Sequence, residues 1–152
     1  MNMGVSALVL VVSLLAPRPN FSGTWVMDTN RSFSNPAGLE QTMTIIQDGG
    51  KITLDAKLKT QQGERTLNEQ YVVNGQEAAF TPPPGPDGKT VTGKRTASWL
   101  PDNRGLLVID IVGEQTTTRK WSLSPDGKVL TVDYFFDTPR GNFEAKRVFA
   151  RQ

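Results

Sequence analysis

The stretch Phe21-Ser22-Gly23-Thr24-Trp25 decides the fold, because it opens a long pattern in which side-chain character alternates with period two. Phe21, Gly23, Trp25 and Met27 fall on one face of such a segment. Strict alternation is typical of a β-strand with one face in the core, and almost no helical periodicity follows it. The stretch therefore predicts the first strand of a small antiparallel barrel, of the kind that encloses one small apolar ligand.

An apolar run of twelve residues, 5–16, precedes this strand and stops at Pro17. A membrane-spanning helix needs roughly 20 apolar residues and the core of a signal peptide about 7–15, so the run predicts an export signal. Residues 1–4 contain no Lys or Arg, and Pro17 is a poor residue after a cleavage point, so a retained anchor and a buried strand remain alternatives. We expect a signal peptide or anchor over 1–16, a barrel domain over 20–152, and a periplasmic or secreted location.

Composition excludes several functions. The chain has no cysteine and no histidine, and its 17 basic and 15 acidic residues give a net charge of +2. Disulfides, thiolate zinc sites and thiol nucleophiles are excluded, and the commonest general base and metal ligand are absent. The sequence contains no block of Lys and Arg of the kind that would indicate nucleic-acid binding. The acidic residues show no metal-ligand spacing, so we expect no metal, no cofactor and no enzyme.

About ten short strands follow one another with tight turns. Asn74-Gly75 is a strong hairpin signal, and the Pro82–Pro86 stretch must be an exposed connection because proline cannot donate ladder hydrogen bonds. The pattern fits a sandwich or an up-and-down barrel of eight to ten strands, and the absence of long crossovers favours the barrel. The expected strands are 21–27, 43–45, 52–58, 67–73, 78–80, 91–99, 106–112, 116–123, 129–136 and 143–151.

Gly23-Thr24-Trp25 resembles the opening of three groups of calycin barrels, namely lipocalins, intracellular fatty-acid-binding proteins and avidin-type proteins. The resemblance implies that Gly23 lets the strand bend at the closed end of the barrel and that Trp25 plugs it, with Arg147 or Arg151 stacked over the ring. Arg147-Val148-Phe149 also resembles the Arg-x-Tyr with which fatty-acid-binding proteins hold a carboxylate, one hydroxyl being lost. In overall style the chain is most similar to exported bacterial proteins described as lipocalin-like.

Strand phase supplies a clue that is independent of any resemblance. Arg95, Arg119 and Arg147 each fall in phase with large apolar residues, while lysines take the opposite face. An inward arginine is costly unless it is paired, and the inward-phase Glu69 is a candidate partner. Two interpretations remain open: the arginines hold an anionic ligand head, or one stacks on Trp25, one pairs with Glu69 and one reaches a rim.

The sequence thus predicts non-catalytic binding of a small hydrophobic or amphipathic, possibly anionic, molecule in the barrel interior. The alternatives are a filled barrel that acts as a protein-interaction or inhibitor module, with Pro82–Pro86 as contact surface, and an unfamiliar enzyme. The aromatic residues either line a cavity or fill a collapsed core. The candidate ligand-binding residues are Tyr71, Arg95, Trp99, Arg119, Trp121, Tyr134, Arg147 and Phe149, and the motif residues are Gly23 and Trp25.

Overall fold

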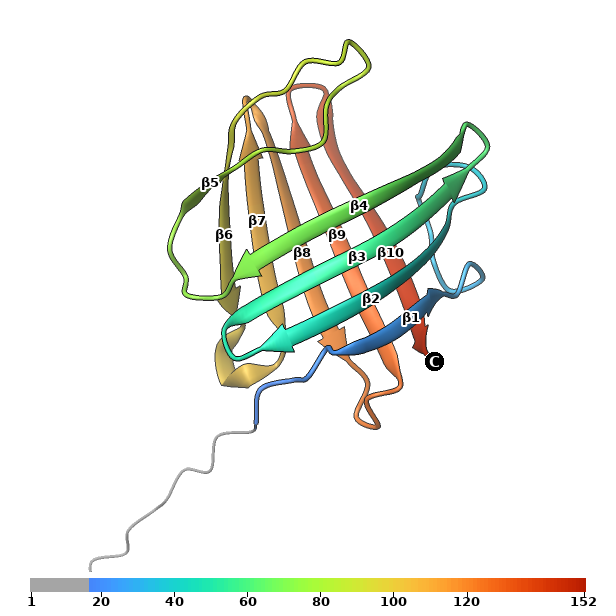
Figure 1. The fold of residues 1–152 in the computed structure, drawn as a ribbon, viewed down its shortest axis with the longest axis vertical. Coiled ribbons are helices and arrows are strands. Elements are labelled where there is room, and N and C mark those ends of the chain that lie inside the picture. Colours follow the sequence, from blue (N-terminus) through green and yellow to red (C-terminus); the bar gives the residue numbers. More distant parts are fainter. Residues whose placement is uncertain (1–16) are drawn as a thin grey trace, which may run out of the picture.

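The computed structural model describes residues 17–152, so the predicted export segment lies outside the described residues. Period-two alternation of buried and exposed residues runs through most of the described chain, which forms ten β-strands and one short 3-10 turn (Figure 1). The strands are β1 Gly23–Met27, β2 Glu40–Asp48, β3 Lys51–Thr60, β4 Gly63–Val72, β5 Ala78–Phe80, β6 Gly93–Trp99, β7 Leu106–Val112, β8 Gln115–Leu123, β9 Val129–Thr138 and β10 Gly141–Arg151.

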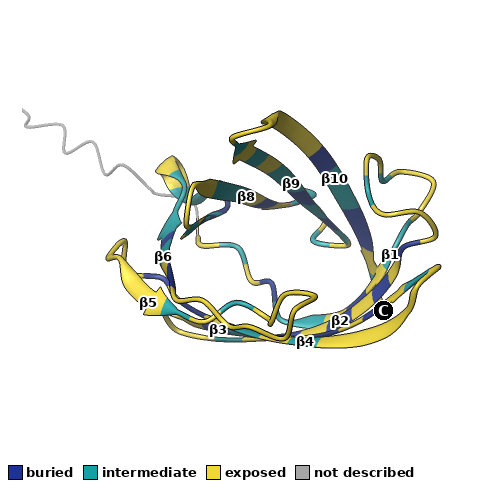
Figure 2. Cartoon of the chain, turned by 90° about the horizontal axis from the view of Figure 1, so that it is seen from above, coloured by how far each residue is buried: buried dark blue, intermediate teal, exposed yellow. Residues whose placement is uncertain are grey.

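All ten strands belong to one antiparallel sheet, in the order β4-β3-β2-β1-β10-β9-β8-β7-β6-β5. Every strand pairs with its neighbour in sequence except at β4–β5, and β1 pairs with β10 to curl the sheet round (Figure 2). The predicted up-and-down barrel is confirmed. Its wall is incomplete, because β4 and β5 are the two ends of the sheet and a single parallel bridge, Val73 to Ala97, joins β4's end to β6.

Aromatic residues close one end of the barrel. Phe21 and Trp25 are fully buried, and the Trp25 Nε1 donates to the Phe21 carbonyl at 2.9 Å. The Arg151 guanidinium lies 4.4 Å from the centroid of the Trp25 ring, so Arg151 and not Arg147 takes this position. Gly23 has a φ of +145°, and a Cβ there would meet the Arg151 Nη1 at 2.8 Å. Only glycine therefore fits the bend beneath the stacked pair.

Two connections differ from the expectations. The hairpin predicted at Asn74-Gly75 is wrong: Gly75 has the positive φ of a turn, but its amide donates to Ala97 of β6, and β5 pairs with β6 instead of β4. The 29–38 region is irregular and is attached to the wall by an antiparallel bridge between Phe33 and Lys146. Pro82–Pro86 lies on an exposed connection, as predicted. The turn Pro101–Asn103 forms a 3-10 helix that the sequence pattern did not indicate. Within residues 17–152, no helix is long and apolar enough to cross a membrane.

Candidate functional site

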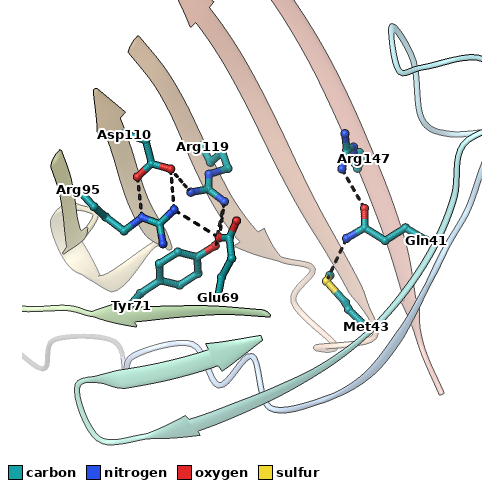
Figure 3. Close-up of polar contacts among 8 residues, drawn as sticks. All are labelled: Gln41, Met43, Glu69, Tyr71, Arg95, Asp110, Arg119 and Arg147. Carbon is teal, nitrogen blue, oxygen red and sulfur yellow. Dashed lines mark hydrogen bonds and ion pairs between the residues drawn. The ribbon is translucent and has the colours of Figure 1, made fainter. Parts of the chain in front are cut away.

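The three inward-phase arginines enter the interior from three different strands. Arg95 lies on β6, Arg119 on β8 and Arg147 on β10, and at most 11% of the side chains of Arg95 and Arg119 is exposed. The lysines next to them in sequence lie on the opposite face, as expected: Lys94 and Lys120 are exposed and Lys146 is partly exposed. Figure 3 shows that Arg95 and Arg119 converge on one group of residues, while Arg147 lies apart with Gln41.

Arg95 and Arg119 belong to a charged cluster made of Glu69, Tyr71, Arg95, Asp110 and Arg119. Arg95 donates to both oxygens of Asp110, at 2.6 and 2.8 Å. Arg119 donates to Asp110 at 2.7 Å, to Glu69 at 2.9 Å and to the Tyr71 hydroxyl at 2.8 Å, and Tyr71 in turn donates to Glu69. The predicted pairing with Glu69 is therefore present. Two guanidinium groups face two carboxylates, so the cluster is neutral.

Burial and charge act against each other in this cluster. Burial alone would raise the pKa of Glu69, but Arg119, Arg95 and the hydrogen bond from Tyr71 outweigh it and hold that pKa below 4.5. Burial raises the pKa of the Tyr71 hydroxyl well above 10, so it stays protonated and donates. Burial by itself lowers the pKa of Arg119, and the surrounding oxygens more than reverse this, so its charge is kept.

Arg147 has neutral partners. Its Nε donates to the Asn35 side-chain oxygen and its Nη1 to the Gln41 side-chain oxygen, both at 2.9 Å. Its guanidinium lies 4.7 Å from the centroid of the Tyr134 ring. No carboxylate in residues 17–152 forms an ion pair with Arg147. Three arginines and two carboxylates therefore leave one interior positive charge unmatched, at Arg147.

A small cavity of about 30 Å³ lies between the two groups. The Nε of Arg119 and the Nε1 of Trp121 are buried and find no hydrogen-bond partner among the described residues, and both side chains line this cavity. The space suffices for one or two water-sized groups, far below the several hundred Å³ typical of ligand pockets. The cavity lining is rich in donors and the interior beside it carries a net positive charge. Its lining residues are Gln41, Met43, Leu54, Leu67, Glu69, Tyr71, Arg119, Trp121, Val132, Tyr134, Arg147 and Phe149.

The remaining predicted residues divide between this cavity and the closed end. Trp121, Tyr134 and Phe149 line the cavity. Trp99 does not, because its ring stacks on Phe21 at 6.5 Å within the closed-end aromatic group. The aromatic residues thus belong to one packed core that leaves a void of only about 30 Å³, so the interior lies closer to the filled core than to the open cavity of the two alternatives.

Sequence reasoning missed three polar residues of the interior. Asp110 alternates in phase with Leu106 and Val108, but β7 is apolar on both faces and so gives no sign of which face is inside. Gln41 is buried and in phase with Met43, a signal that could have identified it. Asn35 lies in an irregular connection, where periodicity gives no information.

Larger hollows lie elsewhere. Two of about 520 and 460 Å³ share Thr42, Lys57 and Thr66, which are register neighbours on β2, β3 and β4, and include none of the three arginines. In the described part of the chain, no group of three acidic residues is placed to hold a metal ion.

Comparison with known proteins identifies the class of fold. No family model matches the chain, and no curated protein matches its sequence. Solved structures do: the fatty acid transporter REP1-NXSQ (TM-score 0.61, 14% identity, 86% of this chain and 95% of that one) and fatty-acid-binding protein 1 of Echinococcus granulosus (0.60, 14%, 86% and 96%). A third is a Schistosoma mansoni fatty acid binding protein in complex with arachidonic acid (0.56, 15%, 87% and 96%).

These likenesses show that the chain has the β-barrel fold of fatty-acid-binding proteins. By their names, these three neighbours transport or bind fatty acids. The lipocalin-like character, the bacterial origin and the role of the Gly-x-Trp motif as a family signature stay predictions.

Proposed function

We propose that this chain is a non-catalytic binding protein for a small amphipathic molecule with one anionic head, which Arg147 holds. The observation that carries the proposal is the unmatched charge of Arg147, whose hydrogen-bond partners are the amide oxygens of Asn35 and Gln41. A carboxylate matches the guanidinium fork in geometry and also neutralises its charge, which a neutral amide oxygen does not do. An anionic head would therefore replace the amides, and the buried donors of Arg119 and Trp121 lie around the adjacent cavity.

The apolar part of the ligand must lie outside the cavity. The cavity of about 30 Å³ admits a head group but no tail. Towards the end of the barrel opposite Trp25, inward-phase apolar residues are less buried, and Phe143 is 55% exposed. A bound tail would lie along Tyr134, Phe136 and Phe143, and deeper entry requires the wall to move.

The structural neighbours support this class of ligand. One is described as a complex with arachidonic acid and another, an ileal bile-acid-binding protein of zebrafish, as a complex with cholic acid. Both of those ligands are carboxylates with an apolar body. The Arg147-Val148-Phe149 ending of this chain, with its resemblance to Arg-x-Tyr, agrees with a carboxylate head.

Binding of the amphipathic anion 1-anilinonaphthalene-8-sulfonate (ANS), displaced by a long-chain fatty acid, tests the proposal. Hydrogen bonds to a charged group are worth about 1.5–3 kcal/mol, so Arg147→Gln should weaken the affinity for both molecules about tenfold or more. Arg140→Gln, at an exposed position in the turn between β9 and β10, is the matched control and should bind normally. Equal affinities in the wild type and a folded Arg147→Gln protein would refute the role of Arg147.

The packed interior favours a second candidate, the filled-barrel interaction or inhibitor module. An interior void of only about 30 Å³ agrees with a filled barrel. The Pro82–Pro86 connection is exposed and so is accessible to a partner protein. Native mass spectrometry of the purified protein separates the two functions. Co-purified lipid that Arg147→Gln abolishes supports ligand binding, whereas an empty protein that also fails to bind ANS or fatty acid supports the interaction module.

The proposal includes export. It is supported by the length of the apolar run over residues 5–16 and by the small residue Ala16 before Pro17. The intact mass of protein recovered from the extracytoplasmic fraction tests it. Loss of residues 1–16 is expected, and full-length protein confined to the cytoplasm would refute it.

A further inference from the structure

The barrel wall has one line that no β-ladder closes. Nine neighbouring strand pairs are joined by antiparallel ladders, whereas the described β4 and β5 share none. We call the gap between these two edges the seam. Because the cavity is too small for an apolar tail, uptake into the interior requires the wall to widen, and the seam is where widening costs least.

Backbone contacts close the seam only near the plugged end. Val73, just after β4, forms a parallel bridge with Ala97 of β6, and the Gly75 amide donates to the Ala97 carbonyl at 2.9 Å. At Arg95, two residues before Ala97 on β6, side chains and not backbone groups bridge the gap. The Arg95 guanidinium lies 4.8 Å from the centroid of the Tyr71 ring on β4 and 4.1 Å from that of Phe80 on β5, so it fills the space between the two edges.

The two sides of the seam are held very differently. β4 pairs with β3 over ten residues, and Arg119 ties its Glu69 and Tyr71 to the opposite wall. β5 pairs with β6 over only three residues. In residues 78–92, which we call the β5 flap, all side chains are exposed except Phe80 and Pro82, which are partly buried. The flap has few buried contacts, so it is the part of the wall that can move.

The Phe80 side chain holds the β5 flap against the barrel wall. Its ring lies over Arg95 on one side, and it approaches the backbone of Gly93 so closely that a Cβ there would meet the Phe80 Cε1 at 2.7 Å. The absence of a side chain at Gly93 thus leaves room for the Phe80 ring. Two hydrogen bonds to Asp110 fix Arg95 in place. The rest of the flap rises past the strand ends at the open end of the barrel (Figure 1).

We propose that the β5 flap is the gate of the barrel: release of Phe80 from Arg95 and Gly93 detaches β5 from β6 and opens the seam for an amphipathic ligand. The ligand rests on the proposed function, but the mobility of the flap does not. A gate changes the rates of entry and exit together and leaves the equilibrium affinity nearly unchanged, which a purely structural contact would not do.

A disulfide staple tests the gate, since the chain has no native cysteine. Ala79 and Lys94 are directly opposed on β5 and β6 and both are exposed, and opposed residues in antiparallel strands lie within disulfide reach. In Ala79→Cys/Lys94→Cys, oxidation should slow ANS association and dissociation at least tenfold, with Kd changed less than threefold, and reduction should restore both rates. Unchanged rates in the oxidised protein would overturn the gate.

Hydrogen exchange supplies an arm that needs no ligand. In the wild type, amides of 78–80 should exchange at least tenfold faster than those of β8 and β9, and Phe80→Ala should speed them at least tenfold further without altering β8 and β9. Phe135→Ala, on the outer face of β9, is the control, and it should leave the exchange of the 78–80 amides unchanged. Slow exchange at 78–80, or no effect of Phe80→Ala, would overturn the flap, whereas mobile flap amides in a protein that does not bind ANS would overturn only the proposed function.

Discussion

Replacing Arg119 by methionine removes the guanidinium that joins three groups of the charged cluster. Arg119 donates to Glu69 at 2.9 Å, to Tyr71 at 2.8 Å and to Asp110 at 2.7 Å, and 7% of the residue is exposed. Removing one partner of a buried ion pair typically costs about 3–5 kcal/mol, because the other charge stays buried. Glu69 would keep only Arg95, 3.6 Å away, as an ion-pair partner, so we expect a loss in this range.

The assays are urea unfolding and thermal unfolding, both followed by the fluorescence of the tryptophans. A loss of about 3–5 kcal/mol corresponds to a fall in Tm of about 10–20 °C in a domain of this size. If the uncompensated charge is the cause, adding Glu69→Gln to Arg119→Met should recover part of the loss, with a coupling of at least about 1 kcal/mol. The reasoning is refuted if Arg119→Met costs less than about 1 kcal/mol, or if the two substitutions add independently. Arg140→Met is the surface control.

Three further predictions concern the rest of the fold. Because the folded pKa of Glu69 is depressed, its contribution is complete above the unfolded pKa of about 4.5 and is lost as the pH falls through the folded value, so acid titration of Glu69→Gln should show a flatter stability curve than the wild type. Gly105→Ala should lower the urea midpoint strongly, since its Cβ would collide with the carbonyl oxygen of Trp121. Gly50→Ala, whose Cβ would lie 3.8 Å from the nearest atom, should be nearly neutral, and equal effects would contradict this. Arg151→Met should cost about 1–3 kcal/mol in the same assay, through its lost carbonyl bonds and its stacking on Trp25, and an unchanged midpoint would exclude that role.

The strand pattern could be predicted because one face of most strands is buried and the other wet. β8 shows this plainly: Arg119 and Trp121 are buried while Lys120 is exposed. The same rule fails on β7, where Ile109 and Ile111 on the outer face are as apolar as Val108 inside. Asp110 then cannot be assigned to the interior from the sequence.

The partner of each arginine was harder to predict than its direction. Strand phase places Glu69 and the arginines on the inner face, but it does not give which arginine Glu69 meets across the barrel. Glu69 and Arg119 lie 50 residues apart and meet only because β4 and β8 stand on opposite parts of a curled sheet. Asn35 reaches Arg147 from an irregular connection 112 residues away, which no periodicity encodes.

The charged cluster is poorly explained by stability alone. Hydrophobic residues of similar volume in place of a buried ion network are often as stable or more so. The cluster instead determines the charge that the interior presents: Glu69 and Asp110 neutralise Arg95 and Arg119, and Arg147 alone keeps an unmatched charge beside the cavity. The same Arg95 also seats Phe80 of the flap. One network thus leaves a single interior charge for a ligand head. Through Arg95 it also holds Phe80, and with it the part of the wall through which, on our proposal, the ligand passes.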